Sequence, residues 1–328
     1  MVQEFIRTMR KKTVQHRLWL VLVLGILGSG AIAFQSFFSF IQIGHAETMA
    51  TVAKLADTEK QRTEAFSQVV LEARGGYVLD LTTNVVLFSK NSEEVLPLAS
   101  VTKLMTTFVA AENMSNSVVV SLTKDDLSTE GDSGLRVGER WRMGDLLDVM
   151  LVISSNDAAH AIAGLVGGAG QQNVLGSHEH FIEMMNEKAR TLGLATLKFY
   201  NESGLDLEQG GVSIMAGGYG SAKDVALLVA ELWKKYPTTL EITTRKDVRI
   251  VSQDGIAHIL PNTNEALGQY PGMIGSKTGY TSLAGGNLAI IFDIGIGHPV
   301  VAVILGSTRE GRFSDMRALT QATLKAFE

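Results

Sequence analysis

The stretch from Gly275 to Ser307 reads GSKTGYTSLAGGNLAIIFDIGIGHPVVAVILGS. Its runs of apolar and β-branched residues are separated by glycine-rich turns, a pattern typical of consecutive β-strands. The segment that follows, FSDMRALTQATLKAF (313–327), repeats apolar residues at helical spacing and predicts an amphipathic helix. The C-terminal part of the chain is therefore expected to form neighbouring strands and one closing helix.

Working outward from this stretch, a second strand region lies near the other end. The segments YVLDL (77–81) and VVLF (85–88) are separated by the turn residues Thr82, Thr83 and Asn84, which predicts a β-hairpin. The chain between the two strand regions has helical character. Strands at both ends around a helical middle predict an α/β (α+β) fold, with an antiparallel sheet flanked by helices and an inserted helical lobe.

The helical middle contains two informative segments. SVTKLMTTFVAAENM (100–114) has helical periodicity, and WRMGDLLDVMLVISSNDAAHAIAGLV (141–166) gives two helical stretches interrupted around Ser154 and Ser155. One domain spanning 75–328 accounts for the strands and for the lobe.

Composition excludes several classes of protein. The 328 residues are 45% apolar and carry a formal net charge of −5, with no basic stripe in the body of the chain, so no nucleic-acid partner is expected. Cysteine is absent, which excludes disulfides, thiolate metal sites and cysteine nucleophiles. Catalysis would therefore depend on oxygen and nitrogen groups.

The N-terminal segment predicts attachment to a membrane. Five cations within 1–17 precede an uncharged stretch from Leu18 to Ala46, which is long enough to span the bilayer core as a helix. Basic residues before the span place the N-terminus in the cytoplasm and the rest of the chain outside. We favour an anchor at 18–46 over a cleaved signal peptide, because signal-peptide cores are shorter. Residues 47–74 are expected to form a linker or outer helix.

Ser100 and Lys103 form the first candidate catalytic pair. They stand three residues apart at the head of a helical segment, so both side chains fall on one face. A serine hydroxyl is inert until a base takes its proton, and a lysine is a base only when uncharged. Burial and a second nearby cation would both lower its pKa. Ser121 and Lys124 repeat the spacing, but they lie beside a charged turn where an ammonium stays solvated.

A second polar group is the trio Ser154-Ser155-Asn156, between two apolar helical runs. One interpretation is a helix cap, because serine and asparagine commonly satisfy the free amides of a first turn. The other is functional, with Ser154 relaying a proton to a leaving amine while Asn156 orients Lys103. The residues alone leave both interpretations open.

A third motif, Lys277-Thr278-Gly279, occurs once in the chain. On an edge strand beside a cleft, the lysine and threonine would hold a carboxylate, and the glycine would keep ligand approach free. An ordinary glycine-rich hairpin is the alternative. Ser-x-x-Lys, Ser-x-Asn and Lys-Thr-Gly in this order form the trio known from β-lactamases and penicillin-binding proteins.

From about Gly75 onward the chain resembles the low-molecular-weight penicillin-binding proteins, which are serine-type D-alanyl-D-alanine carboxypeptidases. The resemblance extends beyond the catalytic triplets to LPLASVTKLMT, ISSNDAAHAIA, FIEMMNEKARTLGL, FYNESGLD, SAKDVALLVAEL, NTNEAL and GSKTGYT. It implies a β-lactamase/transpeptidase-like fold, action on peptidoglycan stem peptides ending in D-Ala-D-Ala, and acylation by β-lactam antibiotics.

The resemblance also assigns roles to residues. Ser100 is the acylated nucleophile and Lys103 its base, and the backbone amides of Ser100 and Tyr280 form the oxyanion hole. The substrate carboxylate is expected near Lys277, Thr278 and Arg312. The remaining site residues are Ser154, Asn156 and Gly279.

Several alternatives stay open. A β-lactamase would need a carboxylate for deacylation, and Glu202-Ser203-Gly204-Leu205-Asp206 superficially imitates such a loop. The other two alternatives are an endopeptidase of the same family and a non-catalytic penicillin-binding scaffold. Family members often carry a further β-rich domain and a C-terminal membrane helix, whereas this sequence stops at Glu328, so the N-terminal segment is the expected attachment.

Metal chemistry is not expected from the sequence. His178-Glu179-His180 is suggestive, but histidines two apart point to different sides of a helix and no third ligand is evident. We interpret them as solvated residues at a helix start. No metal and no cofactor are predicted, and the expected location is the cell membrane with an extracytoplasmic catalytic domain, or the periplasm if 18–46 is cleaved.

Overall fold

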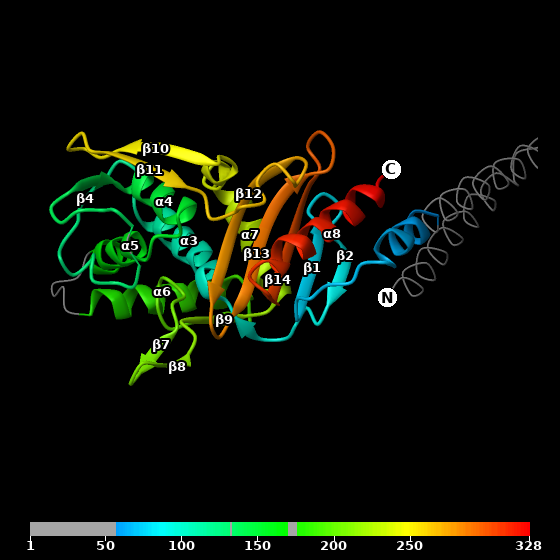
Figure 1. The fold of residues 1–328 in the computed structure, drawn as a ribbon, viewed down its shortest axis with the longest axis horizontal. Coiled ribbons are helices and arrows are strands. Elements are labelled where there is room, and N and C mark those ends of the chain that lie inside the picture. The colour runs from blue at the N-terminus through cyan, green and yellow to red at the C-terminus, as the bar shows by residue number, and fades with distance from the viewer. Residues whose placement is uncertain (1–56, 132, 170–175) are drawn as a thin grey trace, which may run out of the picture. The chain divides into compact units, whose positions relative to one another are not determined.

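A five-stranded antiparallel sheet organises the part of the chain that the computed structural model describes, residues 57–131, 133–169 and 176–328. Its strands are β1 (Gly75–Asp80), β2 (Val85–Lys90), β12 (Met273–Thr281), β13 (Gly285–Asp293) and β14 (Pro299–Ser307). The strand order is β12-β13-β14-β1-β2, so the N-terminal hairpin and the C-terminal strands share one sheet (Figure 1). The predicted sheet closed by both ends of the domain is confirmed.

The centre of the sheet is β14, which is buried on both faces. Its side chains alternate between two apolar clusters, because successive residues of a strand point to opposite faces. Val301 and Val303 join the cluster of the helical lobe, whereas Val300 and Ala302 join the cluster beneath the C-terminal helix. A nearly continuous apolar run is thus the sequence signature of a strand covered on both sides.

Helices cover both faces of this sheet. The C-terminal helix α8 (Gly311–Lys325) packs against β13 and β14, and α7 (Ala222–Lys235) packs against β1 and β14. Buried residues of α8 belong to one apolar cluster and those of α7 to the other, so the two helices lie on opposite faces (Figure 1). The sheet is therefore the middle layer of the fold.

The helical lobe is inserted between β2 and the C-terminal strands. A short 3₁₀ helix, η1 (Ala99–Thr102), runs into α3 (Lys103–Asn113), and α4 (Met143–Val152) is separated from α5 (Asn156–Gly168) at the predicted interruption. The lobe continues with α6 (Ser177–Thr191). Its buried side chains and those of one sheet face form a single cluster, so the lobe is fixed against the sheet.

Short elements complete the described part. They are β3 (Leu96–Pro97), β4 (Val119–Ser121), β5 (Arg140–Arg142), β6 (Lys198–Phe199), β7 (Leu207–Gln209), β8 (Val212–Met215), β9 (Gly218–Gly220), η2 (Glu241–Thr244), β10 (Asp247–Val251) and β11 (Ala257–Pro261). The compact unit begins at Arg62, and Ala65, Phe66 and Leu71 are buried in the cluster beneath α8.

The transmembrane helix predicted between Leu18 and Ala46 lies outside the described residues and stays a prediction. Among the helices that the structure describes, none combines the length and the apolar character needed to cross a bilayer.

Candidate active site

Ser100 and Lys103 lie where η1 passes into α3. Residues three apart eclipse one another in a 3₁₀ turn, and this brings the Lys103 Nζ to 3.0 Å from the Ser100 Oγ. Ser100 is partly exposed, whereas Lys103 is fully buried at 0% exposure. The local geometry therefore presents a reachable hydroxyl in front of a dry amine.

The Lys103 amine contacts three oxygens. Besides Ser100 Oγ, it lies 2.8 Å from Asn156 Oδ1 and 2.7 Å from the carbonyl oxygen of Ser203. An ammonium donates to all three. A neutral amine has only two hydrogens, which Asn156 and Ser203 accept, so its lone pair is left to accept the hydroxyl proton of Ser100. The arrangement suits either protonation state.

Burial decides which state is accessible. It lowers the pKa of Lys103 to about 7, while the negative charge of Glu202 acts in the opposite direction. A base with a pKa near 7 is neutral in a large fraction of molecules at physiological pH. Of the two causes expected from the sequence, burial is the main one, and no second cation is among the causes that lower this pKa.

Ser154, Ser155 and Asn156 form the bend between α4 and α5. The helix cap predicted as one alternative is present, but it belongs to Ser155, whose side chain accepts from the Ala158 amide at 3.0 Å. Ser154 has a left-handed backbone (φ 61°), and its Oγ accepts from Lys277. The amide of Asn156 links two groups, since Oδ1 accepts from Lys103 and Nδ2 donates to the carbonyl of Glu130.

Lys277 lies on β12, which is the edge strand predicted for it. Its Nζ donates to Ser154 Oγ and to the Thr278 carbonyl, both at 2.9 Å, and the side chain is buried. Burial, followed by repulsion from Lys103 and Arg312, holds the pKa of Lys277 well below its usual range. Two lysines thus face one site from the lobe and from the sheet, and a charge on Lys103 disfavours a charge on Lys277.

Gly279 allows a close approach between two elements. A Cβ at this position would lie 2.9 Å from the Leu98 carbonyl oxygen and 3.2 Å from the Ser100 nitrogen. The glycine therefore lets β12 pack tightly against η1, and its expected role in ligand approach stays a prediction. The neighbouring Tyr280 has an exposed ring, with the Arg309 guanidinium 5.1 Å from its centroid.

Thr278 and Arg312 are engaged with the protein. The hydroxyl of Thr278 lies 2.7 Å from that of Thr263, a residue that sequence reasoning did not single out. Arg312 is buried, and its Nη1 donates to the Gly279 carbonyl at 2.9 Å. Arg312 thereby fixes the backbone of β12 beside Ser100.

Sequence reasoning missed the carbonyl of Ser203. Gly204, with φ 81°, packs so tightly on η1 that a Cβ would lie 1.9 Å from the Ala99 carbonyl oxygen. This close approach turns the preceding carbonyl toward Lys103. A backbone acceptor leaves no signal in the residue types. The glycine in the segment FYNESGLD (199–206), which resembles a family segment, was the only indication of this close approach.

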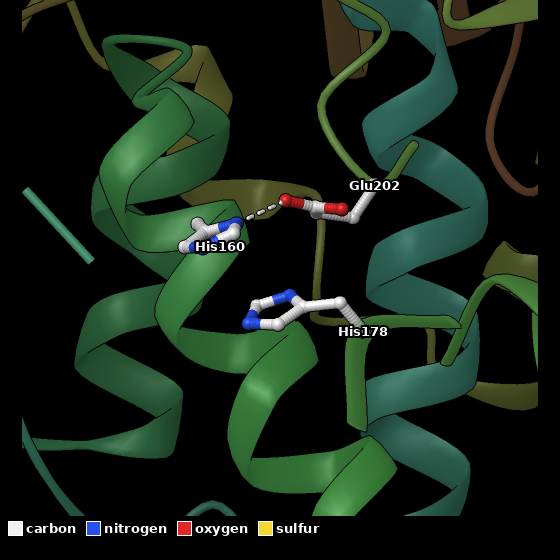
Figure 2. A group of neighbouring side chains, drawn as sticks. All are labelled: His160, His178 and Glu202. Carbon is white, nitrogen blue, oxygen red and sulfur yellow. Dashed lines mark hydrogen bonds and ion pairs between the residues drawn. The ribbon is translucent and has the colours of Figure 1, made fainter. Parts of the chain in front are cut away.

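The carboxylate of Glu202, in the segment that superficially imitates a β-lactamase loop, bonds His160 Nδ1 at 2.7 Å. One further expectation is corrected by the structure. His178 is not a solvated residue at the start of α6, because its ring stacks on His160 with centroids 3.8 Å apart (Figure 2). His180, two residues on, instead lies 3.8 Å from Glu183.

Comparison with known proteins agrees with this geometry. Residues 60–309 match the peptidase family S11, described as D-alanyl-D-alanine carboxypeptidase. The chain is 33% identical to D-alanyl-D-alanine carboxypeptidase DacF of Bacillus subtilis strain 168, over 69% of this chain and 55% of that protein. It therefore matches only about half the length of that relative.

A relative with a different printed activity is the D-alanyl-D-alanine endopeptidase of Haemophilus influenzae, 38% identical over 40% of this chain and 44% of that protein. Among solved structures, ampicillin-bound penicillin-binding protein D2 of Listeria monocytogenes superposes with a TM-score of 0.64 at 28% identity, covering 80% of this chain and all of that one. The chain therefore belongs to the D-alanyl-D-alanine carboxypeptidase family of low-molecular-weight serine penicillin-binding proteins.

Proposed function

We propose that this chain is a serine-type D-alanyl-D-alanine carboxypeptidase that acts on peptidoglycan stem peptides through an acyl-enzyme at Ser100. One observation carries the proposal: the reachable hydroxyl of Ser100 lies 3.0 Å from a fully buried lysine amine whose pKa is about 7. A hydroxyl paired with such a base is an activated nucleophile. Family membership agrees with this chemistry.

In the acylation step, neutral Lys103 takes the hydroxyl proton of Ser100 while Oγ bonds to the carbonyl carbon of the penultimate D-alanine. The oxyanion lies between the backbone amides of Ser100 and Tyr280. The close approach of Gly279 to the Ser100 nitrogen supports this pairing, because it brings the two backbones together. Asn156 and Ser203 hold the amine in place.

The terminal D-alanine then leaves as its C–N bond breaks. Ser154 passes its hydroxyl proton to the leaving amine and receives in turn the proton that Lys103 took from Ser100, so Lys103 is neutral again. Lys277 supports this step, because its Nζ donates to Ser154 Oγ and polarises that hydroxyl. A water molecule, with Lys103 again as base, attacks the ester, frees the shortened peptide and regenerates Ser100.

Recognition of the substrate carboxylate is assigned to Lys277 and Thr278, with Arg312 acting through the backbone of β12. An incoming carboxylate favours the charged form of Lys277, whose pKa is held low by burial. Substrate binding thus restores a cation on the sheet side while Lys103 on the lobe side stays neutral. The charged Lys277 can then bind the carboxylate while the neutral Lys103 acts as the base.

The test combines covalent labelling with a peptide assay. Intact mass of the full chain after treatment with penicillin should show one adduct, and peptide mapping should place it on Ser100. A model peptide ending in D-Ala-D-Ala should release D-alanine, and Ser100→Ala should abolish both signals. Rapid turnover of penicillin would instead favour a β-lactamase, and an adduct without peptide turnover would favour a non-catalytic scaffold.

The endopeptidase activity printed for the Haemophilus influenzae relative makes cross-link cleavage a second candidate. Both reactions cut a bond after a D-alanine and share the same acyl-enzyme. Incubation with cross-linked muropeptide dimers separates them, because an endopeptidase yields monomers and a carboxypeptidase yields only free D-alanine.

We also propose an extracytoplasmic location, with 18–46 as a membrane anchor. The cations before this uncharged stretch support the orientation. Protease treatment of spheroplasts should degrade the catalytic domain, and truncation to 47–328 should release it from membranes. Degradation only after lysis would contradict the proposed orientation. No nucleic-acid partner is proposed.

A further inference from the structure

Three side chains that the proposed reaction does not use converge behind the active site. His160 lies on α5, His178 in the first turn of α6, and Glu202 in the loop after β6 (Figure 2). One nitrogen or carboxylate oxygen from each lies within 4.8 Å of the others. The three residues, named here the His-His-Glu cluster, come from distant parts of the sequence.

Part of the cluster is explained without any ligand. His160 Nδ1 and Glu202 Oε1 lie 2.7 Å apart, and this hydrogen bond raises the pKa of His160. The other nitrogen of His160 lies 3.9 Å from Asp125. His160 and Glu202 would therefore form a satisfied ion pair on their own.

His178 is the member that this ion pair leaves unexplained. Within the part of the chain that the structure describes, its Nδ1 is buried and has no hydrogen-bond partner. Buried polar atoms in folded proteins almost always have a partner, and an unmet one costs stability.

Gly164 makes room for this ring. It lies one helical turn after His160 on α5, and a Cβ there would be 3.1 Å from His178 Nε2. The Nε2 edge is therefore turned toward the α5 backbone. The Nδ1 atom is the one left for a ligand in the cluster.

We propose that His160, His178 and Glu202 form a site for a divalent transition metal, with Zn²⁺ as the expected occupant. Two imidazoles and one carboxylate are a donor set typical of zinc, and water would complete the coordination. The ion replaces the proton shared by His160 Nδ1 and Glu202 Oε1, and His178 Nδ1 supplies the third ligand.

Metal binding requires a local rearrangement. Metal–ligand distances near 2.1 Å at a tetrahedral angle separate two donors by about 3.4 Å, so the pair at 2.7 Å must open by roughly 0.7 Å. The two stacked imidazoles, whose planes are 13° apart, must also rotate so that both lone pairs point at the ion. Asp125 is placed to accept from the free Nε2–H of His160, as carboxylates beside metal-bound histidines do. The charges of Asp125, Asp126 and Glu179 add a negative field around the imidazoles.

The metal would join α5, the start of α6 and the Glu202 loop. The same loop presents the Ser203 carbonyl to Lys103, so the metal would stabilise one wall of the proposed active site. Its role is structural, and it takes no part in bond cleavage.

The test is a Zn²⁺ titration of the full chain, solubilised in detergent and stripped with a chelator, in competition with a fluorescent zinc indicator. One equivalent should bind with micromolar or tighter affinity, and Co²⁺ in its place should give visible d–d absorption. Thermal unfolding should shift upward with Zn²⁺. Glu202→Gln keeps a hydrogen-bond partner for His160 but removes the charge of the ligand, so it should weaken binding by more than the roughly 10- to 100-fold that loss of an outer-shell partner costs.

His178→Phe keeps the stacked ring but removes the ligand, and it should lose both the affinity and the thermal shift. His180→Ala is the matched control on the same helix and should bind Zn²⁺ as the unchanged chain does. Absence of stoichiometric binding, or equal affinity in folded His178→Phe, would overturn the site. Penicillin labelling of Ser100 reports on the proposed function separately, since it needs no metal.

Discussion

The chain contains two Ser-x-x-Lys tetrads with opposite surroundings. Ser100 and Lys103 span η1 and the start of α3, with the amine fully buried among three oxygens. Ser121 ends β4, Lys124 lies in the following turn, and both are exposed. Identical spacing therefore gives a hydroxyl–amine pair in one place and two solvated side chains in the other.

The difference shows what spacing alone leaves out. Residues three apart face each other only where the backbone is helical, and Ser121 sits on a strand. Solvent then keeps an exposed ammonium charged, whereas burial lowers the pKa of Lys103 to about 7. Helical backbone and burial together convert a serine–lysine pair into a nucleophile and its base.

Replacement of each serine by alanine gives the largest expected contrast between the two tetrads. Ser100→Ala should remove the penicillin adduct and all D-alanine release, because no other hydroxyl occupies that position. Ser121→Ala should leave both unchanged. Intact mass spectrometry of both variants measures this directly, and a surviving adduct in Ser100→Ala would place the nucleophile elsewhere.

Replacement of each lysine by methionine should give the second largest contrast. Lys103→Met keeps the apolar stem but removes the base, so the rate constant of acylation should fall by about 10²- to 10⁴-fold. Lys124→Met should change it by less than about twofold, as expected for a surface substitution away from the site. Stopped-flow labelling with a fluorescent penicillin gives both rates. Equal rates in the two variants would remove Lys103 from the mechanism.

The pH dependence of acylation sharpens the comparison further. Only neutral Lys103 accepts the proton, so below a pKa of about 7 the rate should rise about tenfold per pH unit. Between about pH 5 and pH 8 the increase should approach 100-fold, followed by a plateau. A rate that keeps rising toward pH 10 would show that Lys103 is solvated like Lys124.

The smallest expected effect is on stability. The folded pKa of Lys103 lies below its unfolded value, so the unfolded chain binds more protons above pH 7 and stability rises with pH up to about 10.5. From pH 6 to pH 9 this contribution is on the order of 2 kcal/mol in the free energy of unfolding.

Lys103→Met should lack that increase, while Lys124→Met should keep it. Urea unfolding of both variants at the two pH values measures the difference. The same pH dependence in both variants would mean that the buried amine does not titrate near neutrality.

The fold was largely predictable because its signals are local. The hairpin of β1 and β2, the interruption between α4 and α5, and the three C-terminal strands each follow from apolar runs and turn residues. The pairing of β1 with β14 follows once both ends of the domain must cover the same helical lobe.

The candidate site was predictable in its residue types but not in its contacts. Ser154 and Ser155 are adjacent serines, and only the backbone conformation assigns the cap to Ser155. The close packing at Gly279 was not predicted, because the atoms that it accommodates belong to Leu98, Ala99 and Ser100, far away in sequence. His160 and Glu202 were not connected with His178, because no spacing relates three separate segments.

The sequence by itself determined the main strands, the main helices and the order of the three motifs, since these depend on periodicity and residue type. Only the tertiary structure decided which lysine is buried, which carbonyl accepts a hydrogen bond from it, and which imidazole nitrogen has no partner among the described residues. Burial and long-range contact set those properties, and both arise from packing between segments that the linear order leaves far apart.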